Sequence, residues 1–152
     1  MSKMLIIIKN KEYKIIKDLG KGWNGRVIQV ESKSDKKYYA IKEIIINNEK
    51  KDKIKDIEKE ADILSKFNCK NIVKYHESYK NGNKFYIIME YCDGQNLRDF
   101  INKIIKKNQL IEENIIYKII EQICIGNKEI HDRNIIHRDI KPENIFINDK
   151  MI

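Results

Sequence analysis

The chain has 152 residues, a length that suits one ordinary domain. It carries 31 Lys and Arg against 23 Asp and Glu, for a formal net charge of +8. The lysines are spread along the whole chain among acidic residues, which is typical of a solvated surface. Composition therefore gives no reason to expect a nucleic-acid partner.

The cysteines and the apolar N-terminal run exclude several classes of protein. Cys69, Cys92 and Cys124 are far apart and odd in number, and no C-x-x-C spacing occurs. Neither a zinc site nor a disulfide framework is expected, and free thiols suit a reducing compartment. The apolar run at residues 4–8 is too short for a signal peptide or a membrane span. We expect a cytoplasmic protein without membrane partners, with a nuclear or cytoskeleton-associated location left open.

Residue patterns in the first part of the chain predict antiparallel strands. Runs rich in β-branched and aromatic residues are bounded by turn residues. Asn81-Gly82 between the last two runs is a strong hairpin signal. The five predicted strands cover residues 13–20, 26–32, 37–46, 72–79 and 84–91, and residues 5–9 offer an extra short strand before the first.

Helical periodicity appears once among these strands and then dominates the rest of the chain. A helix over about 51–67 carries an apolar stripe of Ile54, Ile57, Ala61 and Leu64. Two further helices are predicted over 97–107 and 112–133, and short strands over 135–136 and 145–147. The buried side of the longer helix is predicted to carry Ile116, Ile119, Ile120, Ile123 and Ile130.

A glycine-rich run, Gly20-Lys21-Gly22-Trp23-Asn24-Gly25, separates the first two predicted strands. Glycines let a backbone approach phosphate groups closely and present N–H groups to them. A dinucleotide-binding motif of this spacing would lie between a strand and a helix. The position between two strands instead favours a phosphate lid, with an ordinary turn as the alternative. We therefore expect Gly20, Lys21, Gly22 and Gly25 to bind nucleotide.

Lys42 follows the glycine run at the spacing of a lysine that pairs with phosphates and with a helix glutamate. Glu60 is the best partner for it. Glu60 lies three residues after Ile57 and four before Leu64, so it shares the helix edge that faces the sheet. The alternative is that Lys42 and Glu60 are ordinary surface charges.

The most informative run, residues 137–144, reads His-Arg-Asp-Ile-Lys-Pro-Glu-Asn. It places Asp139, Lys141 and Asn144 in one short loop. These groups suit phosphoryl transfer, because an acidic group orients the attacking hydroxyl, a cation neutralises the phosphate and an amide holds a metal ion. His137 is expected to hold the backbone of this loop rather than to transfer protons.

Taken together and in this order, the motifs resemble those of eukaryotic protein kinases over about residues 13–147. Lys141, two residues after Asp139, is similar to the serine/threonine class. Residues 89–94 and 131–139 are most similar to NIMA-related (NEK-like) kinases. The resemblance implies an α+β fold, with an N-lobe of five antiparallel strands and one helix over 1–91, and the hinge and first helices of a helical C-lobe over 92–152.

The resemblance also implies an activity and its ligands. The activity is transfer of the γ-phosphate of ATP, with Mg²⁺, to a Ser or Thr hydroxyl of a protein substrate. Asp139 would orient or accept the proton of that hydroxyl, Lys141 would steady the phosphate, and Asn144 would hold Mg²⁺. The adenine site would comprise Met89 as gatekeeper, the hinge Glu90–Cys92, and Val27, Ala40, Leu97 and Phe146.

The sequence also departs from the kinase pattern. No Asp-Phe-Gly occurs within the 152 residues, so we expect this chain by itself to be inactive although its family is enzymatic. Two hypotheses remain, a fragment of an active kinase and a non-catalytic module that binds nucleotide or protein. Gln95 stands where similar kinases carry a glycine, and Asn127 stands where they carry an apolar residue.

Overall fold

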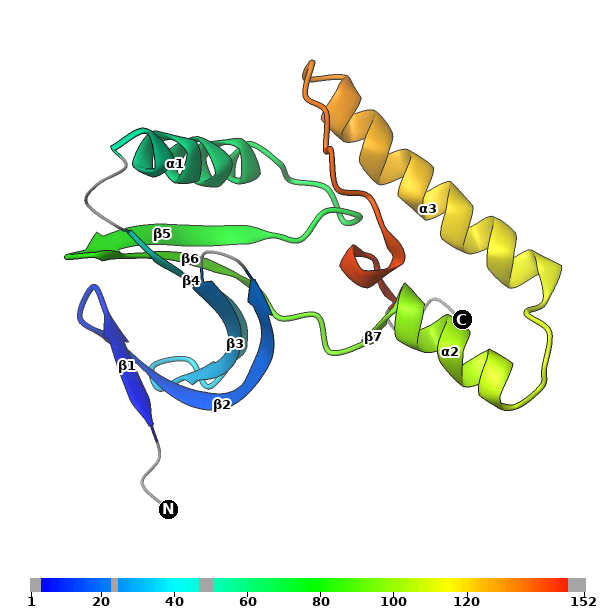
Figure 1. Ribbon diagram of the computed structural model, residues 1–152, viewed down its shortest axis with the longest axis horizontal. Helices are drawn as coiled ribbons and strands as arrows, with labels where there is room; N and C mark the ends of the chain where they lie inside the picture. Colours follow the sequence, from blue (N-terminus) through cyan, green and yellow to red (C-terminus); the bar gives the residue numbers. More distant parts are fainter. Residues whose placement is uncertain (1–3, 23–24, 47–50, 148–152) are drawn as a thin grey trace. The chain divides into compact units, whose positions relative to one another are not determined.

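The computed structural model describes residues 4–22, 25–46 and 51–147, without the side chains of 51–53. The chain divides into two compact units. The first comprises Met1–Asn68 with Val73–Tyr91, and the second comprises Cys69–Ile72 with Cys92–Ile152. The first unit contains an antiparallel sheet and helix α1, whereas the second contains the later helices (Figure 1).

The sheet of the first unit has six strands in the order β1-β2-β3-β4-β6-β5. All five predicted strands form, and the extra strand at the N-terminal end is present as β1. The fourth predicted strand begins at Tyr75 instead of Ile72, because the N–H of Ile72 donates to the carbonyl of Cys69 in a turn. The strands are β1 (Leu5–Ile8), β2 (Lys11–Gly22), β3 (Gly25–Ser32), β4 (Tyr38–Ile45), β5 (Tyr75–Asn81) and β6 (Lys84–Glu90).

Two tight turns fix the register at both edges of the sheet. Lys9 and Asn10 join β1 to β2 with φ angles of 49° and 63°. Positive φ at both central residues is the mark of a type I′ turn, whose twist matches that of the strands. Asn81 pairs with Lys84 across the predicted hairpin, and Gly82 has a φ of 57°.

Both faces of the sheet bury apolar side chains, because successive residues of a strand point to opposite sides. Helix α1 (Lys51–Ser65) packs on one face, where the predicted stripe meets the sheet. In Figure 1, α1 runs beside β5 and β6, while β2 and β3 are strongly curved. The helix face of the sheet is built by Ile44, Ile46, Phe85 and Ile87 with Ala61 of α1, and the opposite face by Ile8, Tyr13, Ile28, Val30, Ile41, Tyr86 and Ile88.

The second unit contains both predicted helices, α2 (Leu97–Lys106) and α3 (Glu113–His131). The side-chain oxygen of Asn96 accepts the N–H of Asp99 at 2.8 Å, which is a regular N-cap for α2. Helix α3 packs closely against residues 69–72 at Gly126. A Cβ atom at Gly126 would lie 3.0 Å from the carbonyl oxygen of Asn71, so this glycine permits the contact.

The predicted buried side of α3 is wrong for two of its five isoleucines. Ile130 is buried and Ile119 and Ile123 are half-buried. Ile116 and Ile120 are 40% and 50% exposed. They lie on the flank of the helix away from Gln122 and Gly126, the residues that approach Asn71.

The predicted strand at 135–136 does not form. Asn134 and Arg138 bracket it with φ angles of 57° and 65°, which are incompatible with an extended run. The predicted strand at 145–147 is present as β8 (Phe146–Ile147). Its antiparallel partner is β7 (Gln95–Asn96), a strand that the sequence pattern did not indicate.

Two departures from the kinase pattern have a structural cost. The side-chain oxygens of Gln95 and Asn127 are buried and have no hydrogen-bond partner in the described part of the chain. A buried polar atom without a partner costs about 1–3 kcal/mol. A glycine at position 95 or an apolar residue at position 127 would not need such a partner.

A short polar network orders the turn between β3 and β4. The Tyr39 hydroxyl donates to Asp35 Oδ2 at 2.6 Å, and the Lys37 N–H donates to Asp35 Oδ1 at 3.1 Å. The Tyr39 bond, then the Lys37 bond, lower the pKa of Asp35 from 3.8 to about 2. The same bond to Asp35, with burial, raises the pKa of Tyr39 to about 12.

Ile8→Ala should destabilise the first unit by about 2–5 kcal/mol, because it leaves a cavity in a packed core. Ile8 is 1% exposed, whereas Ile7 in the same strand is 60% exposed. Ile7→Ala is therefore the matched control and should change stability by about 0.5 kcal/mol or less. Urea unfolding at low chain concentration measures both. Equal losses for the two variants would show that β1 does not seal this core.

Tyr39→Phe should reduce the pH dependence of stability in acid. The pKa of Asp35 lies below its ordinary value of 3.8, so its contribution is full above about pH 4 and is lost as pH falls toward 2. The variant removes the Tyr39 bond, so its free energy of unfolding should fall less steeply over this window. Tyr38→Phe, at the exposed neighbouring position, is the control. Identical pH profiles for wild type and Tyr39→Phe would contradict the prediction.

Candidate functional site

The glycine-rich segment lies at the β2–β3 turn of the first unit. Gly22 pairs with Gly25 across this turn, and Trp23 and Asn24 lie outside the described residues. A Cβ atom at Gly25 would lie 1.9 Å from the carbonyl oxygen of Glu43, so only glycine fits there. Gly20 has no atom within 4 Å of the equivalent position. Another group could therefore approach the backbone closely at Gly20.

Four residues predicted to bind nucleotide share one face of the sheet. Val27 of β3 pairs with Lys42 of β4, and Ala40 of β4 pairs with Met89 of β6. Paired residues in neighbouring strands point to the same side, as do residues two apart. Met89 packs into the core beneath α1, so this row lies on the helix face of the sheet.

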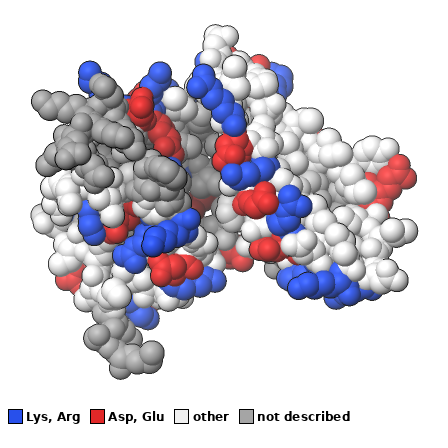
Figure 2. Space-filling view, viewed as in Figure 1, with Lys and Arg blue, Asp and Glu red and all other residues white. Residues whose placement is uncertain are grey.

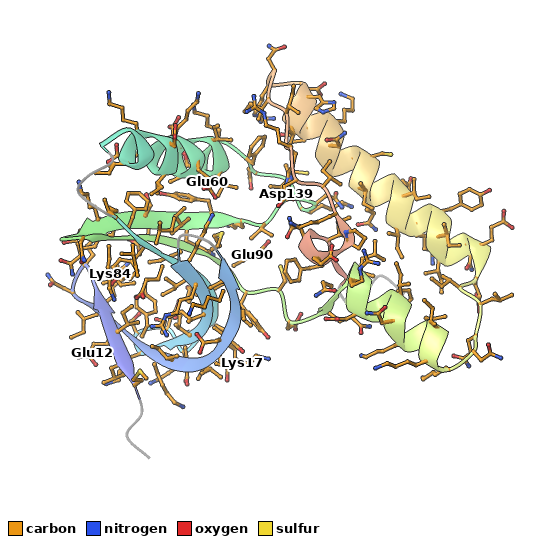
Figure 3. All side chains as sticks on the ribbon, viewed as in Figure 1. Glu12, Lys17, Glu60, Lys84, Glu90 and Asp139 are labelled. Carbon is orange, nitrogen blue, oxygen red and sulfur yellow. The ribbon has the colours of Figure 1, made fainter. Side chains whose placement is uncertain are left out.

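Lys42 and Glu60 form the ion pair that the sequence predicts. Lys42 Nζ lies 2.7 Å from Glu60 Oε1, which joins β4 to α1 within the first unit. Figure 3 labels Glu60 on α1. Both side chains are more than one third exposed, so the pair contributes little to stability. Its effect is to hold the Lys42 ammonium at one position beside the sheet.

The end of β6 is fixed by Glu90, which is labelled in Figure 3. The N–H of Glu90 donates to the carbonyl of Lys74 at 2.9 Å. The carboxylate of Glu90 accepts the N–H of Lys74, also at 2.9 Å. These two hydrogen bonds tie β6 to the start of β5 just before the chain enters the second unit at Cys92.

The loop that follows α3 brings together the three predicted catalytic residues of the second unit. Asp139 Oδ1 lies 2.9 Å from Lys141 Nζ, and Asp139 Oδ2 accepts from Asn144 Nδ2 at 2.8 Å. Asn144 Nδ2 also donates to the carbonyl of Asp139 at 2.9 Å. Figure 3 places Asp139 in this exposed loop.

The surroundings of Asp139 keep it ionised. The bond from Lys141, then the bond from Asn144, lower the pKa of Asp139 below its ordinary value of 3.8. His137 Nδ1 accepts the N–H of Asp139 at 3.2 Å, so His137 holds backbone as the sequence predicts. Between them, Arg138 has a φ of 65°. A non-glycine residue in this region costs energy and is often found at functional sites.

Several supports of this loop were missed at the sequence level. Pro142–Asn144 form a 3₁₀ turn, η1, and the Leu97 N–H donates to the Ile145 carbonyl at 2.8 Å. Arg98 Nε lies 2.9 Å from Glu143 Oε1 and joins α2 to η1. Residues so far apart in the chain share no local sequence pattern that could predict their contact. The opposite charges of Arg98 and Glu143 were the one available hint of their pairing. Phe146, predicted to line the adenine site, is 47% exposed in β8.

Three further features of the described residues bear on possible ligands and partners: the surface charge, potential metal ligands and the length of apolar helices. Figure 2 shows positive and negative side chains interspersed over the visible surface. The described residues contain no group of three or more His, Cys, Asp and Glu that could hold a metal ion. Among them, no helix has both the length and the apolar character needed to cross a membrane.

Comparison with known proteins identifies the family. A family model described as the protein kinase domain matches residues 13–152. The chain is 36% identical over 137 residues to serine/threonine-protein kinase Nek1 of Mus musculus, covering 90% of this chain and 11% of that protein. It is 38% identical over 137 residues to serine/threonine-protein kinase Nek5 of Homo sapiens, covering 90% and 19%.

A third relative comes from a distant organism. The probable serine/threonine-protein kinase nek2 of Dictyostelium discoideum is 35% identical over 143 residues, covering 91% of this chain and 34% of that protein. The chain thus spans about a third or less of the length of these relatives. Because the kinase-domain match extends over most of its residues, the chain belongs to the protein kinase family, and its relatives there are Nek serine/threonine-protein kinases.

Proposed function

We propose that this chain supplies the nucleotide-binding and catalytic-loop residues of a serine/threonine-protein kinase. The reaction is transfer of the ATP γ-phosphoryl group to a Ser or Thr hydroxyl of a protein substrate. The observation that carries the proposal is the contact of Asp139 with both Lys141 and Asn144, at 2.9 and 2.8 Å. An ionised acid, a cation and an amide in one loop supply the positioning and charge that phosphoryl transfer needs.

Asp139 is the group that orients the attacking hydroxyl. Its lowered pKa keeps it a carboxylate at neutral pH, so it can accept a hydrogen bond from the hydroxyl. The hydroxyl oxygen forms a bond to the γ-phosphorus as the bond to the ADP oxygen breaks, and the hydroxyl proton passes to Asp139 or to water. Lys141 places a positive charge beside the phosphoryl group as it moves.

The first unit positions the nucleotide. Lys42 pairs with its phosphates, and Glu60 holds Lys42 in place from α1. Gly20, Lys21, Gly22 and Gly25 cover the phosphates through backbone N–H groups. The adenine ring is assigned to Val27, Ala40, Met89, Phe146 and the hinge Glu90–Cys92.

Asn144 fits the role of a magnesium ligand. Its Nδ2 is engaged with Asp139, so its amide oxygen is the atom that would hold the ion. Magnesium prefers oxygen ligands and often keeps few protein contacts alongside phosphates and water. When bound, Mg²⁺ neutralises the phosphate charge.

The remaining assignments follow from the family and from the surface. A cytoplasmic location is proposed for the chain, with a nuclear or cytoskeleton-associated location as the alternative. Its partners are ATP and a protein substrate, and no nucleic-acid or membrane partner is proposed. The mixed charges on the face seen in Figure 2 form no large basic patch of the kind that binds nucleic acid.

Lys42→Ala should weaken ATP binding about tenfold, because it removes one charge-assisted contact to the phosphates. Lys59→Ala is the matched control, since Lys59 is an exposed lysine next to Glu60 on α1. Isothermal calorimetry with ATP and Mg²⁺ measures both. Equal affinities for wild type and Lys42→Ala would remove Lys42 from the nucleotide site.

In a longer protein that joins these residues to an Asp-Phe-Gly segment, Asp139→Asn should reduce phosphoryl transfer by about 10²–10⁴-fold, as expected for loss of a positioned base. The measurement is transfer of labelled γ-phosphate to a protein containing Ser and Thr. Asp132→Asn is the control, because Asp132 is an exposed acid that pairs with Lys128 at the end of α3. ATP binding by that longer wild-type protein without any transfer would reject this function and favour a non-catalytic binding module.

A further inference from the structure

Strand β1 ends the sheet and pairs with β2 alone among the described strands. Its four residues are Leu-Ile-Ile-Ile. It precedes the segment at 13–152 that matches the kinase-domain model. The strand therefore lies outside the matched domain. The proposed phosphoryl transfer gives no role to its outer edge.

The backbone groups of β1 alternate between the two edges of the strand. The Ile15 N–H donates to the Met4 carbonyl at 2.9 Å, and Ile6 pairs with Tyr13 two residues further along. In an antiparallel ladder every second pair exchanges hydrogen bonds. Ile6 and Ile8 therefore bond to β2, whereas the N–H and C=O groups of Leu5 and Ile7 point to the outer edge.

The same two residues also expose their side chains. Leu5 and Ile7 are 47% and 60% exposed. Proteins usually protect an edge strand with a charge, a proline or a bulge, and β1 contains none of these. An apolar strand with outward-facing backbone groups is a template for pairing with another strand.

Charges beside β1 are arranged in neutral pairs. Lys14, opposite Leu5, lies 3.6 Å from Glu31, and Lys33 pairs with Glu12, opposite Ile7. The charged residues directly opposite Leu5 and Ile7 are therefore each balanced by an opposite charge of the same chain. A partner strand here needs to be apolar and does not need to be acidic, which fits β1 itself.

We propose that β1 pairs antiparallel with β1 of a second copy of this chain. A two-fold axis would pass beside Ile6, so that Leu5 of one copy faces Ile7 of the other and Ile7 faces Leu5. This register lets all outward N–H and C=O groups of Leu5 and Ile7 form hydrogen bonds, because an isologous contact uses the same surface twice. The two six-stranded sheets then continue into one another.

The contact is small, which determines how it should be detected. A ladder of two four-residue strands buries far less than the roughly 1,600 Å² of a standard interface. The dimer should therefore be weak and should form as chain concentration rises. Sedimentation equilibrium of the whole chain, from low micromolar to millimolar concentration, should show a reversible monomer–dimer transition.

Ile7→Pro should weaken this dimer about tenfold or more, since it removes one outward N–H from each copy. The N–H of Ile7 does not bond to β2, so the intramolecular ladder is retained. Ile120→Lys is the control at another exposed isoleucine, in α3, and should leave the dimer unchanged. A circular-dichroism melt checks that each variant is folded.

Leu5→Lys and Ile7→Glu test the register directly. Each alone should weaken the homodimer, whereas an equimolar mixture should form heterodimers, because the introduced lysine of one copy would face the introduced glutamate of the other. A chain that stays monomeric at all concentrations overturns the proposal. So does a dimer that is lost in Ile120→Lys and kept in Ile7→Pro, or a mixture that shows no preference for heterodimers.

Discussion

The alternation of side chains along β4 is the constraint on which the first unit depends. Ile41 points into the core sealed by β1, and Ile44 points into the core beneath α1. Lys42 lies on the same side as Ile44, so the strand that builds both cores also aims one ammonium group at α1. The apolar stripe of α1 holds the helix against the sheet. This packing, and not the ion pair, places Glu60 beside Lys42.

In the second unit, contacts between residues close in the sequence fix the position of Asp139. Asp139 is held by Lys141, Asn144 and the His137 ring, all within five residues of it. The loop ends are fixed by the β7–β8 ladder and by the ion pair of Arg98 with Glu143. These contacts set the orientation and the ionisation of Asp139 while its side chain stays exposed.

In both units, the charged residues of the candidate site are not the residues that stabilise the fold. The pairs Lys42–Glu60 and Lys141–Asp139 are more than one third exposed, and such pairs contribute little to the free energy of folding. Buried isoleucines contribute far more, as at Ile8 in the edge strand. Substitutions of these charged residues should therefore leave the fold intact. Strand β1 contributes to stability through Ile8, which is buried in the core opposite α1.

Sequence alone determined the elements whose signals are local. Periodicity located strands β1 to β6 and helices α1, α2 and α3, and helix spacing selected Glu60 as the partner of Lys42. The sequence could not decide contacts between residues far apart in the chain, because loop closure and packing set them. These include the β7–β8 ladder and the contact of α3 with Asn71, which leaves Ile116 and Ile120 exposed. The loop at 137–144 lies between these cases. Its residues are evident from their order in the sequence, but the hydrogen bonds that orient Asp139 depend on backbone angles, such as the φ of Arg138, that only the folded chain adopts.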